Sequence, residues 1–159
     1  MYIIDPKLKG NIRRYFIQCI CITIFIYLVI SIVDVTMNIT LVASIGATTF
    51  IVFTMPHRRV SNVRYVLGGY IIGILTGTLC WFFGSTYNFI GLSFAGALAI
   101  GISIFFMAIT NTEHPPAAAF AFGIVMDGFH LKTIVIMLFI LILFQIIKKF
   151  TKKWLIDLV

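Results

Sequence analysis

The chain has 159 residues, of which 61% are hydrophobic and only 11% charged, and its mean hydropathy is +1.10. Five acidic and twelve basic residues cannot supply the polar surface of a soluble domain of this size, so the composition excludes the soluble globular classes. The net charge of +7 does not indicate a nucleic-acid partner, because the basic residues stand at the ends of apolar runs and leave no basic-aromatic binding surface. We therefore expect a single transmembrane domain over residues 1–159, surrounded by the lipid bilayer.

Six apolar segments follow one another and predict an all-α integral membrane fold, a compact bundle of about six transmembrane segments. They are residues 15–33, 39–55, 65–83, 92–110, 115–126 and 133–147. About 20 helical residues cross the roughly 30 Å hydrocarbon layer, so four of these segments are long enough and the second is nearly so. The fifth reaches only about 18 Å and needs help from 111–114 to cross. The first is interpreted as a span, since it lacks the small-x-small cleavage site of a signal peptide.

The basic residues indicate the orientation of the segments. They form three clusters, at 7–14, 58–64 and 148–153. Six crossings place eleven basic residues on one side and only Lys132 on the other, whereas a re-entrant segment 115–126 would divide them eight to four. Because basic residues remain on the cytoplasmic side, we expect a multi-pass protein of the cell membrane. Both termini, the basic stretches 1–14 and 148–159, would be cytoplasmic.

The two halves of the chain resemble each other weakly. Alignment of Asn38 with Asn111 places the second segment over the fifth and His57 over His130. The halves would then be two inverted three-helix repeats with short or broken helices 2 and 5, which is a common transporter architecture. Chance similarity between two apolar stretches is the alternative interpretation.

Small residues recur every four positions in two of the segments. The stripes are Gly69, Gly73 and Gly77 in the third and Ser93, Ala97 and Gly101 in the fourth. Such stripes let helix backbones approach closely in lipid, either within the bundle or between copies. Together with the small size of the chain, they favour a homo-oligomer.

Two consecutive prolines interrupt the apolar pattern in "NTEHPPAAAFAFG", residues 111–123. Proline is tolerated in the first turn of a helix, so Pro115, Pro116 and Ala117 are expected to begin a half-helix, with Thr112 upstream as a possible cap. Irregular backbone at membrane depth survives only where it faces protein or a watery cavity. A helix N-terminus also carries free amides and partial positive charge, which favour an anion.

The candidate binding site combines this half-helix with the start of the second segment, which supplies Ser44, Gly46, Thr48 and Thr49. We expect the N-termini of the two short helices to converge on a cavity for a compact anion. His114 would donate a hydrogen bond or carry a proton, and Glu113 would pair with it, with an arginine or with a proton. A cytoplasmic entrance formed by His57, Arg58 and Arg59 would concentrate anions.

Structural roles for the same residues stay open. Glu113 and His114 could cap a loop at the level of the lipid headgroups, and residues 57–59 could form an interfacial anchor. The chain contains no GxSxG, HExxH, P-loop or Cys/His cluster, so we expect neither an enzyme nor a metal or cofactor. The cysteines at 19, 21 and 80 lie in apolar runs without the spacing of a disulfide framework or a metal site.

Three stretches resemble the HPP family of integral membrane proteins, which is named for a His-Pro-Pro motif. They are "LVASIGATTFIVFTMPHRRVSN" (41–62), "YVLGGYIIGILTG" (65–77) and "TNTEHPPAAAFAFG" (110–123). The positions that match the family pattern are Ala43, Ser44, Gly46, Ala47, Pro56, His57, Gly68, Gly69, His114, Pro115, Pro116 and Ala117. The chain departs from the pattern at Ala118 and Ala119, where relatives often carry glycine.

The resemblance implies a compact helical membrane domain and, from plant and cyanobacterial relatives, nitrite transport. No regulatory CBS domain of the kind some relatives carry is expected here. The leading hypothesis is therefore a transporter or channel for a small inorganic anion such as nitrite. The alternatives are a non-transporting membrane scaffold or sensor subunit, and a weak-acid or cation transporter coupled through Glu113.

Overall fold

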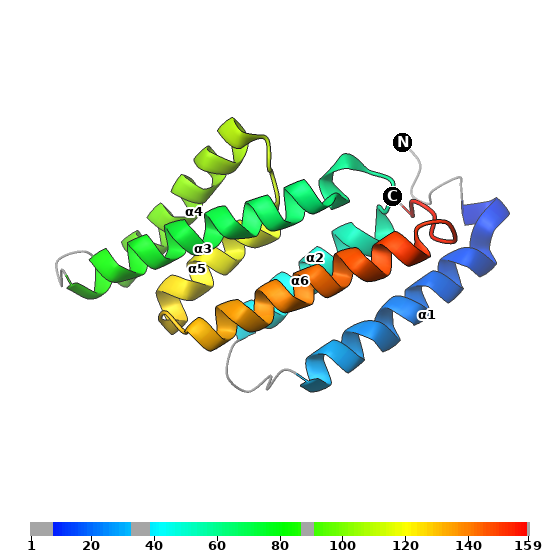
Figure 1. Ribbon diagram of the computed structural model, residues 1–159, viewed down its shortest axis with the longest axis horizontal. Coiled ribbons are helices and arrows are strands. Elements are labelled where there is room, and N and C mark those ends of the chain that lie inside the picture. The colour runs from blue at the N-terminus through cyan, green and yellow to red at the C-terminus, as the bar shows by residue number, and fades with distance from the viewer. Residues whose placement is uncertain (1–7, 33–38, 87–90, 159) are drawn as a thin grey trace.

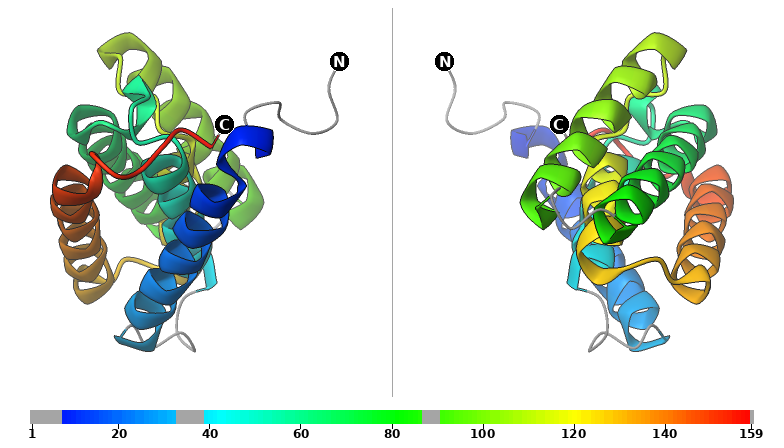
Figure 2. Two further views of the ribbon diagram at one scale, coloured as in Figure 1. Left: turned by 90° about the vertical axis from the view of Figure 1, so that its right-hand side faces the viewer. Right: turned by 90° about the vertical axis from the view of Figure 1, so that its left-hand side faces the viewer.

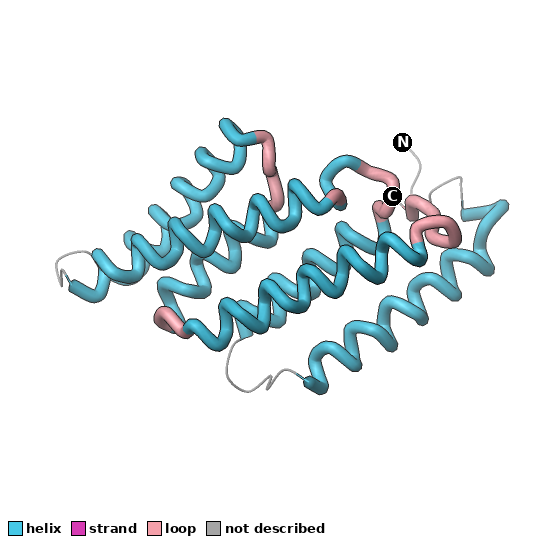
Figure 3. The backbone as a smooth tube through the Cα atoms, viewed as in Figure 1, coloured by secondary structure: helices cyan, strands magenta, loops and turns pink. Residues whose placement is uncertain are grey.

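A computed structural model describes residues 8–32, 39–86 and 91–158, and in these ranges the chain is helical with short loops and no strand (Figure 3). The elements are α1 (Leu8–Ile32), α2 (Ile39–Thr54), the 3-10 turn η1 (Arg59–Ser61), α3 (Val63–Thr86), α4 (Leu92–Thr110), α5 (Pro115–Asp127) and α6 (Leu131–Thr151). The predicted all-α fold with six apolar helices is confirmed. Lys7, which begins the first basic cluster, and Asn38, at which the two halves of the chain were aligned, lie outside the described residues.

Successive helices run in opposite directions, so the start of α1 and the end of α6 lie at the same end of the bundle (Figure 1). Hydrogen bonds hold this end together: Leu158 N donates to Thr54 O (2.8 Å), and Lys148 Nζ donates to Ser61 O (2.6 Å). We call it the basic end, because the described clusters at 13–14, 58–64 and 148–153 gather there. Lys132, just inside α6, lies at the opposite end, which we call the far end.

Four helices contain stretches long and apolar enough to cross a membrane. These stretches are Gly10–Ser31, Val63–Thr86, Leu92–Thr110 and Leu131–Thr151, whereas α2 and α5 are shorter, as predicted. α1 and α4 lie at opposite edges of the bundle, with α2, α3, α5 and α6 between them (Figures 1 and 2). The described fold is therefore a multi-pass helical membrane bundle.

α5 crosses from the middle of the bundle to the far end. The loop after α4 turns back into the bundle before α5 begins (Figure 3). A Cβ added to Gly69 would lie 2.6 Å from His114 Cβ, so α5 starts against the seventh residue of α3, about 9 Å along that helix. At its other end Phe129 stacks on Trp81, late in α3, with ring centroids 5.9 Å apart. The loop and α5 together run from the basic end to the far end of the bundle, which is the path expected of a crossing segment.

The glycine stripe of α3 allows this close approach. A Cβ at Gly77 would lie 2.7 Å from Ala121 O, and one at Gly73 would collide with Ala117 O. The backbones of α3 and α5 therefore touch, as the stripe predicted. The α4 stripe behaves differently: Ala97 is exposed and a Cβ at Gly101 would meet nothing within 4 Å. The face of α4 that is buried in the bundle instead carries Ala95, Ala99, Ser103 and Met107.

Candidate functional site

A cluster of buried polar side chains lies where the loop before α5 meets α2 and α3. His114 Nε2 lies 3.1 Å from Thr48 Oγ1, which in turn lies 2.8 Å from the Tyr70 hydroxyl. Tyr70 Oη also donates to Ser44 O at 3.2 Å. All four residues are at most 1% exposed, and we call them the polar cluster. Its depth along α3 places it within the apolar layer, where buried polar groups are costly and usually functional.

The local sequence brings His114 to this position. α4 ends at Thr110, and its C-cap residue Asn111 adopts the left-handed conformation (φ 54°) that asparagine tolerates. Pro115 disfavours helical geometry at the residue before it, and His114 is accordingly extended, with φ −141° and ψ 89°. The helix restarts at Pro115, as predicted. The break therefore turns the imidazole inward between α2 and α3.

The three contacts of the polar cluster can all be hydrogen bonds in only one arrangement of their protons. A carbonyl can only accept, so the Tyr70 hydroxyl gives its proton to Ser44 O and must accept from Thr48. Thr48 has then used its proton and must accept from His114 Nε2. The imidazole therefore carries its proton on Nε2, and in its neutral form Nδ1 is an acceptor.

Two atoms of the polar cluster have no hydrogen-bond partner among the described residues. They are His114 Nδ1 and Ser44 Oγ, and both are buried from solvent. An unpaired buried polar atom costs about 1–3 kcal/mol, and such atoms are rare in folded proteins. The polar cluster can therefore take a donor at Nδ1, and it can both donate and accept at Ser44.

The start of α5 has fewer free amides than the sequence suggested. Pro115 and Pro116 have no N–H, and Ala117 N donates to His114 O at 2.9 Å. The expectation of exposed amides at this site is therefore corrected, because the prolines that break the helix also remove its first donors. Thr112 does not cap α5: its hydroxyl lies 2.8 Å from Thr110 Oγ1, and His114 is the N-cap residue.

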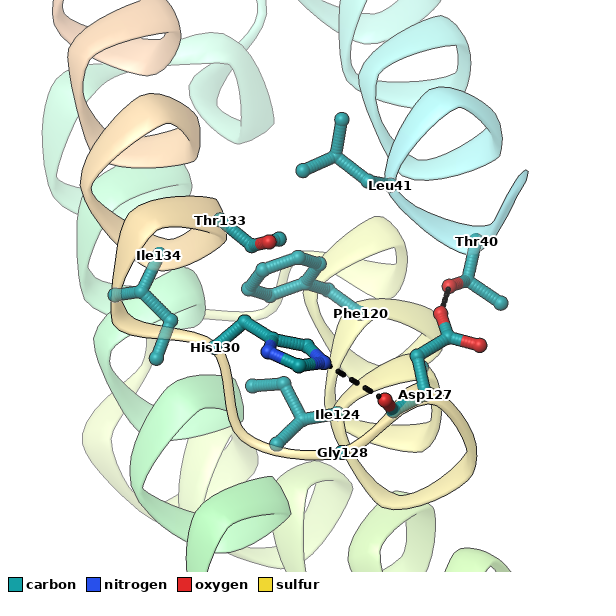
Figure 4. Close-up of a pocket in the computed structure, with 10 residues that line it drawn as sticks. Thr40, Leu41, Phe120, Ile124, Asp127, Gly128, His130, Thr133 and Ile134 are labelled. Atoms are coloured by element: carbon teal, nitrogen blue, oxygen red, sulfur yellow. Dashed lines mark hydrogen bonds between the residues drawn. The ribbon is translucent and has the colours of Figure 1, made fainter. Parts of the chain in front are cut away.

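The expected convergence of the two helix N-termini is wrong. α2 and α5 lie side by side in opposite directions, so the N-terminus of α2 meets the C-terminus of α5 (Figure 4). There Thr40 Oγ1 donates to Asp127 Oδ2 at 2.5 Å, beside a cavity of about 10 Å³ that holds one water at most. The site therefore uses the middle of α2, at Ser44 and Thr48.

The other predicted residues of α2 contribute less to the site. Gly46 is exposed, and a Cβ there would meet nothing within 4 Å. Thr49 is buried, but its hydroxyl donates within its own helix to Ile45 O at 2.7 Å. Tyr70 is the member of the polar cluster that the sequence analysis missed. The available signal was its position in an apolar span, directly after the paired glycines Gly68 and Gly69.

A groove of about 500 Å³ between α4 and α5 reaches the site from the outside of the bundle. Its lining is mostly apolar and includes two ionisable residues, Glu113 and His114. The full lining is Ile100, Ile104, Met107, Ala108, Glu113, His114, Pro115, Ala118 and Ala119. Glu113 is exposed while its neighbour His114 is buried, so the two side chains face different surroundings.

The predicted entrance residues are bonded at the basic end. His57 N donates to Asp157 Oδ1 (3.0 Å), and Arg58 Nε lies 3.9 Å from Asp157 Oδ2. Arg59 donates to Asn111 Oδ1 (2.8 Å) and to the Tyr65 hydroxyl. None of the three contacts the polar cluster. They tie the loop after α2 to the C-terminal segment and to the end of α4.

Comparison with known proteins gives two matches. A profile of the family described as "HPP, transmembrane region" matches residues 7–151. A transmembrane protein of Dictyostelium discoideum is 30% identical over 86 residues, which cover 54% of this chain and 30% of that protein. The matched stretch thus spans less than a third of that relative. No solved structure matches significantly.

Proposed function

The chain belongs to the HPP family of transmembrane proteins, and from this membership and the polar cluster we propose that it is a transporter or channel for a small inorganic anion such as nitrite. The observation that carries the proposal is the buried, unpartnered Nδ1 of His114 at membrane depth. A ligand that bonded to this atom would relieve the cost of leaving it unpaired. Ser44 Oγ would provide a second hydrogen bond.

The nature of the ligand follows from the protons of the polar cluster. Because neutral His114 presents a lone pair at Nδ1, a bare anion would be repelled there. The anion therefore binds together with a proton, which Nδ1 holds and donates to it. Binding of an anion together with a proton is equivalent to binding of the protonated weak acid. The anion hypothesis and the weak-acid alternative therefore describe the same mechanism.

Few other ionisable groups face His114. α2 and α4 contain none in their sequences, and α3 contributes the phenol of Tyr70. Glu113 shares the groove between α4 and α5 with His114. We assign Glu113 the role of passing the proton between the groove and Nδ1. This role explains an acidic residue beside an anion site, where a fixed negative charge would otherwise oppose binding.

The surroundings of the protein follow from the distribution of charge and small residues. The basic end would face the cytoplasm of the cell, which places both termini there. The exposed stripe of Ser93, Ala97 and Gly101 on α4 would pack against a second copy in a homo-oligomer. The groove between α4 and α5 would then be covered by protein rather than lipid, which suits a polar solute.

Flux into proteoliposomes tests the proposal. Purified protein is reconstituted, and uptake of nitrite, nitrate, formate and chloride is compared with protein-free vesicles. We expect nitrite uptake that falls at least about tenfold in His114→Gln, because one transition-state interaction of about 1.4 kcal/mol is lost. His130→Gln is the matched control, since His130 lies at the far end and its Nε2 donates to Asp127 O.

Two results would contradict the proposal. One is that no anion moves and none binds to the purified protein. The other is unchanged flux in His114→Gln together with loss of assembly, which is the result expected of a non-transporting scaffold.

A further inference from the structure

A second, separate pocket lies at the basic end between the start of α3 and the last turns of α6. Its volume is about 380 Å³, and four of its lining residues are basic. The lining consists of Asn62, Val63, Arg64, Gln145, Lys148, Lys149 and Lys152. No acidic side chain is among them. The pocket is distinct from the polar cluster, with which it shares no residue.

The residues of α6 in this pocket share one helix face. Gln145, Lys148, Lys149 and Lys152 are spaced by three and four positions, which places them side by side. Like charges at such spacing repel one another, so Lys148 and Lys152 work against each other at the end of α6. An anion in the pocket would remove this repulsion.

Lys148 is the most informative member of the group, because it is only 5% exposed. Its ammonium donates to Ser61 O (2.6 Å) and Ser61 Oγ (2.8 Å) and lies 3.5 Å from Asn62 Oδ1. All three acceptors are neutral, whereas buried charges are normally paired with an opposite charge. Asp157, the described acid whose charge acts on Lys148, is itself bonded to His57 N and paired with Arg58. Within the part of the chain that the structure describes, no carboxylate therefore forms an ion pair with a basic residue of the pocket.

The position of the pocket matches the boundary between hydrocarbon and headgroups. It lies where two candidate spans, Val63–Thr86 and Leu131–Thr151, reach the basic end. Val63, which lines the pocket, is 51% exposed, and Phe150 and Trp154, which flank its lysines in the sequence, are 74% and 82% exposed. Aromatic residues collect at this level of a membrane, and basic pockets between spans bind anionic headgroups. The N-terminus of α3 adds further positive charge.

We infer that this pocket binds a phosphate group, with Arg64, Lys149 and Lys152 around the anion and Lys148 beneath it. At this depth the phosphate can come from the headgroup of an anionic phospholipid whose acyl chains lie against Val63 and Phe150, or from free phosphate. The bound phosphate joins α3 to α6. It therefore stabilises the basic end independently of what the protein transports.

The test measures lipid and phosphate binding to the full-length protein in neutral detergent. Native mass spectrometry counts retained dioleoylphosphatidylglycerol against dioleoylphosphatidylcholine. Thermal unfolding is followed in potassium phosphate and in potassium chloride of equal ionic strength. We expect tight retention of phosphatidylglycerol over phosphatidylcholine and a higher unfolding temperature in its presence. Stabilisation by phosphate over chloride would identify free phosphate as the source, and stabilisation by the lipid alone would identify the headgroup.

The double variant Lys149→Gln/Lys152→Gln should weaken phosphatidylglycerol binding about 25-fold, or about fivefold for each charge removed. Neither residue makes the Lys148 contacts, so folding should be retained. The matched control Arg13→Gln/Lys153→Gln removes the same charge from exposed positions outside the pocket and should leave binding within about twofold. Equal losses in the two double variants, or no binding of either probe, would overturn the inference.

Discussion

The imidazole of His114, in the loop before α5, is hydrogen-bonded to Thr48 in the middle of α2, 66 positions earlier in the chain. This contact joins the two short helices of the bundle at the point where irregular backbone enters the apolar layer. It also orients Nδ1, the atom on which the proposed function depends.

Replacement of Thr48 by valine should reduce nitrite uptake and lower stability by about 1–3 kcal/mol. Valine has nearly the same shape but leaves His114 Nε2 without a buried partner and leaves the Tyr70 hydroxyl bonded to Ser44 O alone. Thr49→Val is the matched control, because Thr49 is equally buried and bonds only within its own helix. The two variants are compared by thermal unfolding and by flux. Equal effects would show that the polar cluster has no special role.

Replacement of Gly69 by alanine should displace the start of α5. The new Cβ would lie 2.6 Å from His114 Cβ and 3.1 Å from Thr112 O, which leaves no room for it. Overpacking of this kind costs about 1–3 kcal/mol, and uptake should fall because the imidazole moves. Gly46→Ala, in α2, where a Cβ meets open space, should be neutral or stabilising. Unfolding temperature and flux check both variants.

Proton coupling predicts that an inward proton gradient accelerates nitrite uptake and that the external medium becomes more alkaline as nitrite enters. The reason is that the anion binds only when Nδ1 holds a proton. Glutamine in His114→Gln keeps a hydrogen-bond donor and an acceptor, but unlike histidine it does not take up a proton near physiological pH. The residual nitrite uptake of this variant should therefore not depend on the proton gradient. A pH electrode and a nitrite assay on the same vesicles make the measurement. Gradient-dependent uptake in the glutamine variant would contradict the mechanism.

Glu113→Gln separates proton delivery from anion binding. Glu113 faces the groove while His114 faces the polar cluster, so the variant should bind nitrite normally but transport it more slowly. Anion-induced thermal stabilisation measures binding, and vesicle uptake measures transport. A loss of both would place the carboxylate at the anion itself.

The basic end and the far end should lie on opposite sides of the membrane. In a background with Cys19→Ser, Cys21→Ser and Cys80→Ala, a membrane-impermeant maleimide should label Lys153→Cys only from the cytoplasmic side. It should label Lys132→Cys only from the outside. Labelling of both positions from one side would exclude six crossings.

The sequence by itself determined the class of the fold, the number of helices and the position of the break before Pro115. These properties depend on local quantities: the lengths of apolar runs, the spacing of small residues and the inability of proline to continue a helix. For the same reason the predicted bounds of the fourth helix, 92–110, agree with α4. The glycine stripe of the third segment likewise predicted a close helix–helix contact, which α3 makes with α5.

Only the tertiary structure decided what His114 touches. The antiparallel packing of α2 on α5 brings Thr48 to the imidazole and carries the N-terminus of α2 to the far end. Tyr70 joins the site because α3 passes close enough, at Gly69, to present the next side chain. In lipid almost every face of these helices is apolar, so the pattern of hydrophobic residues does not specify which faces meet. Shape and buried hydrogen bonds between distant segments make that choice, and they exist only in the folded chain.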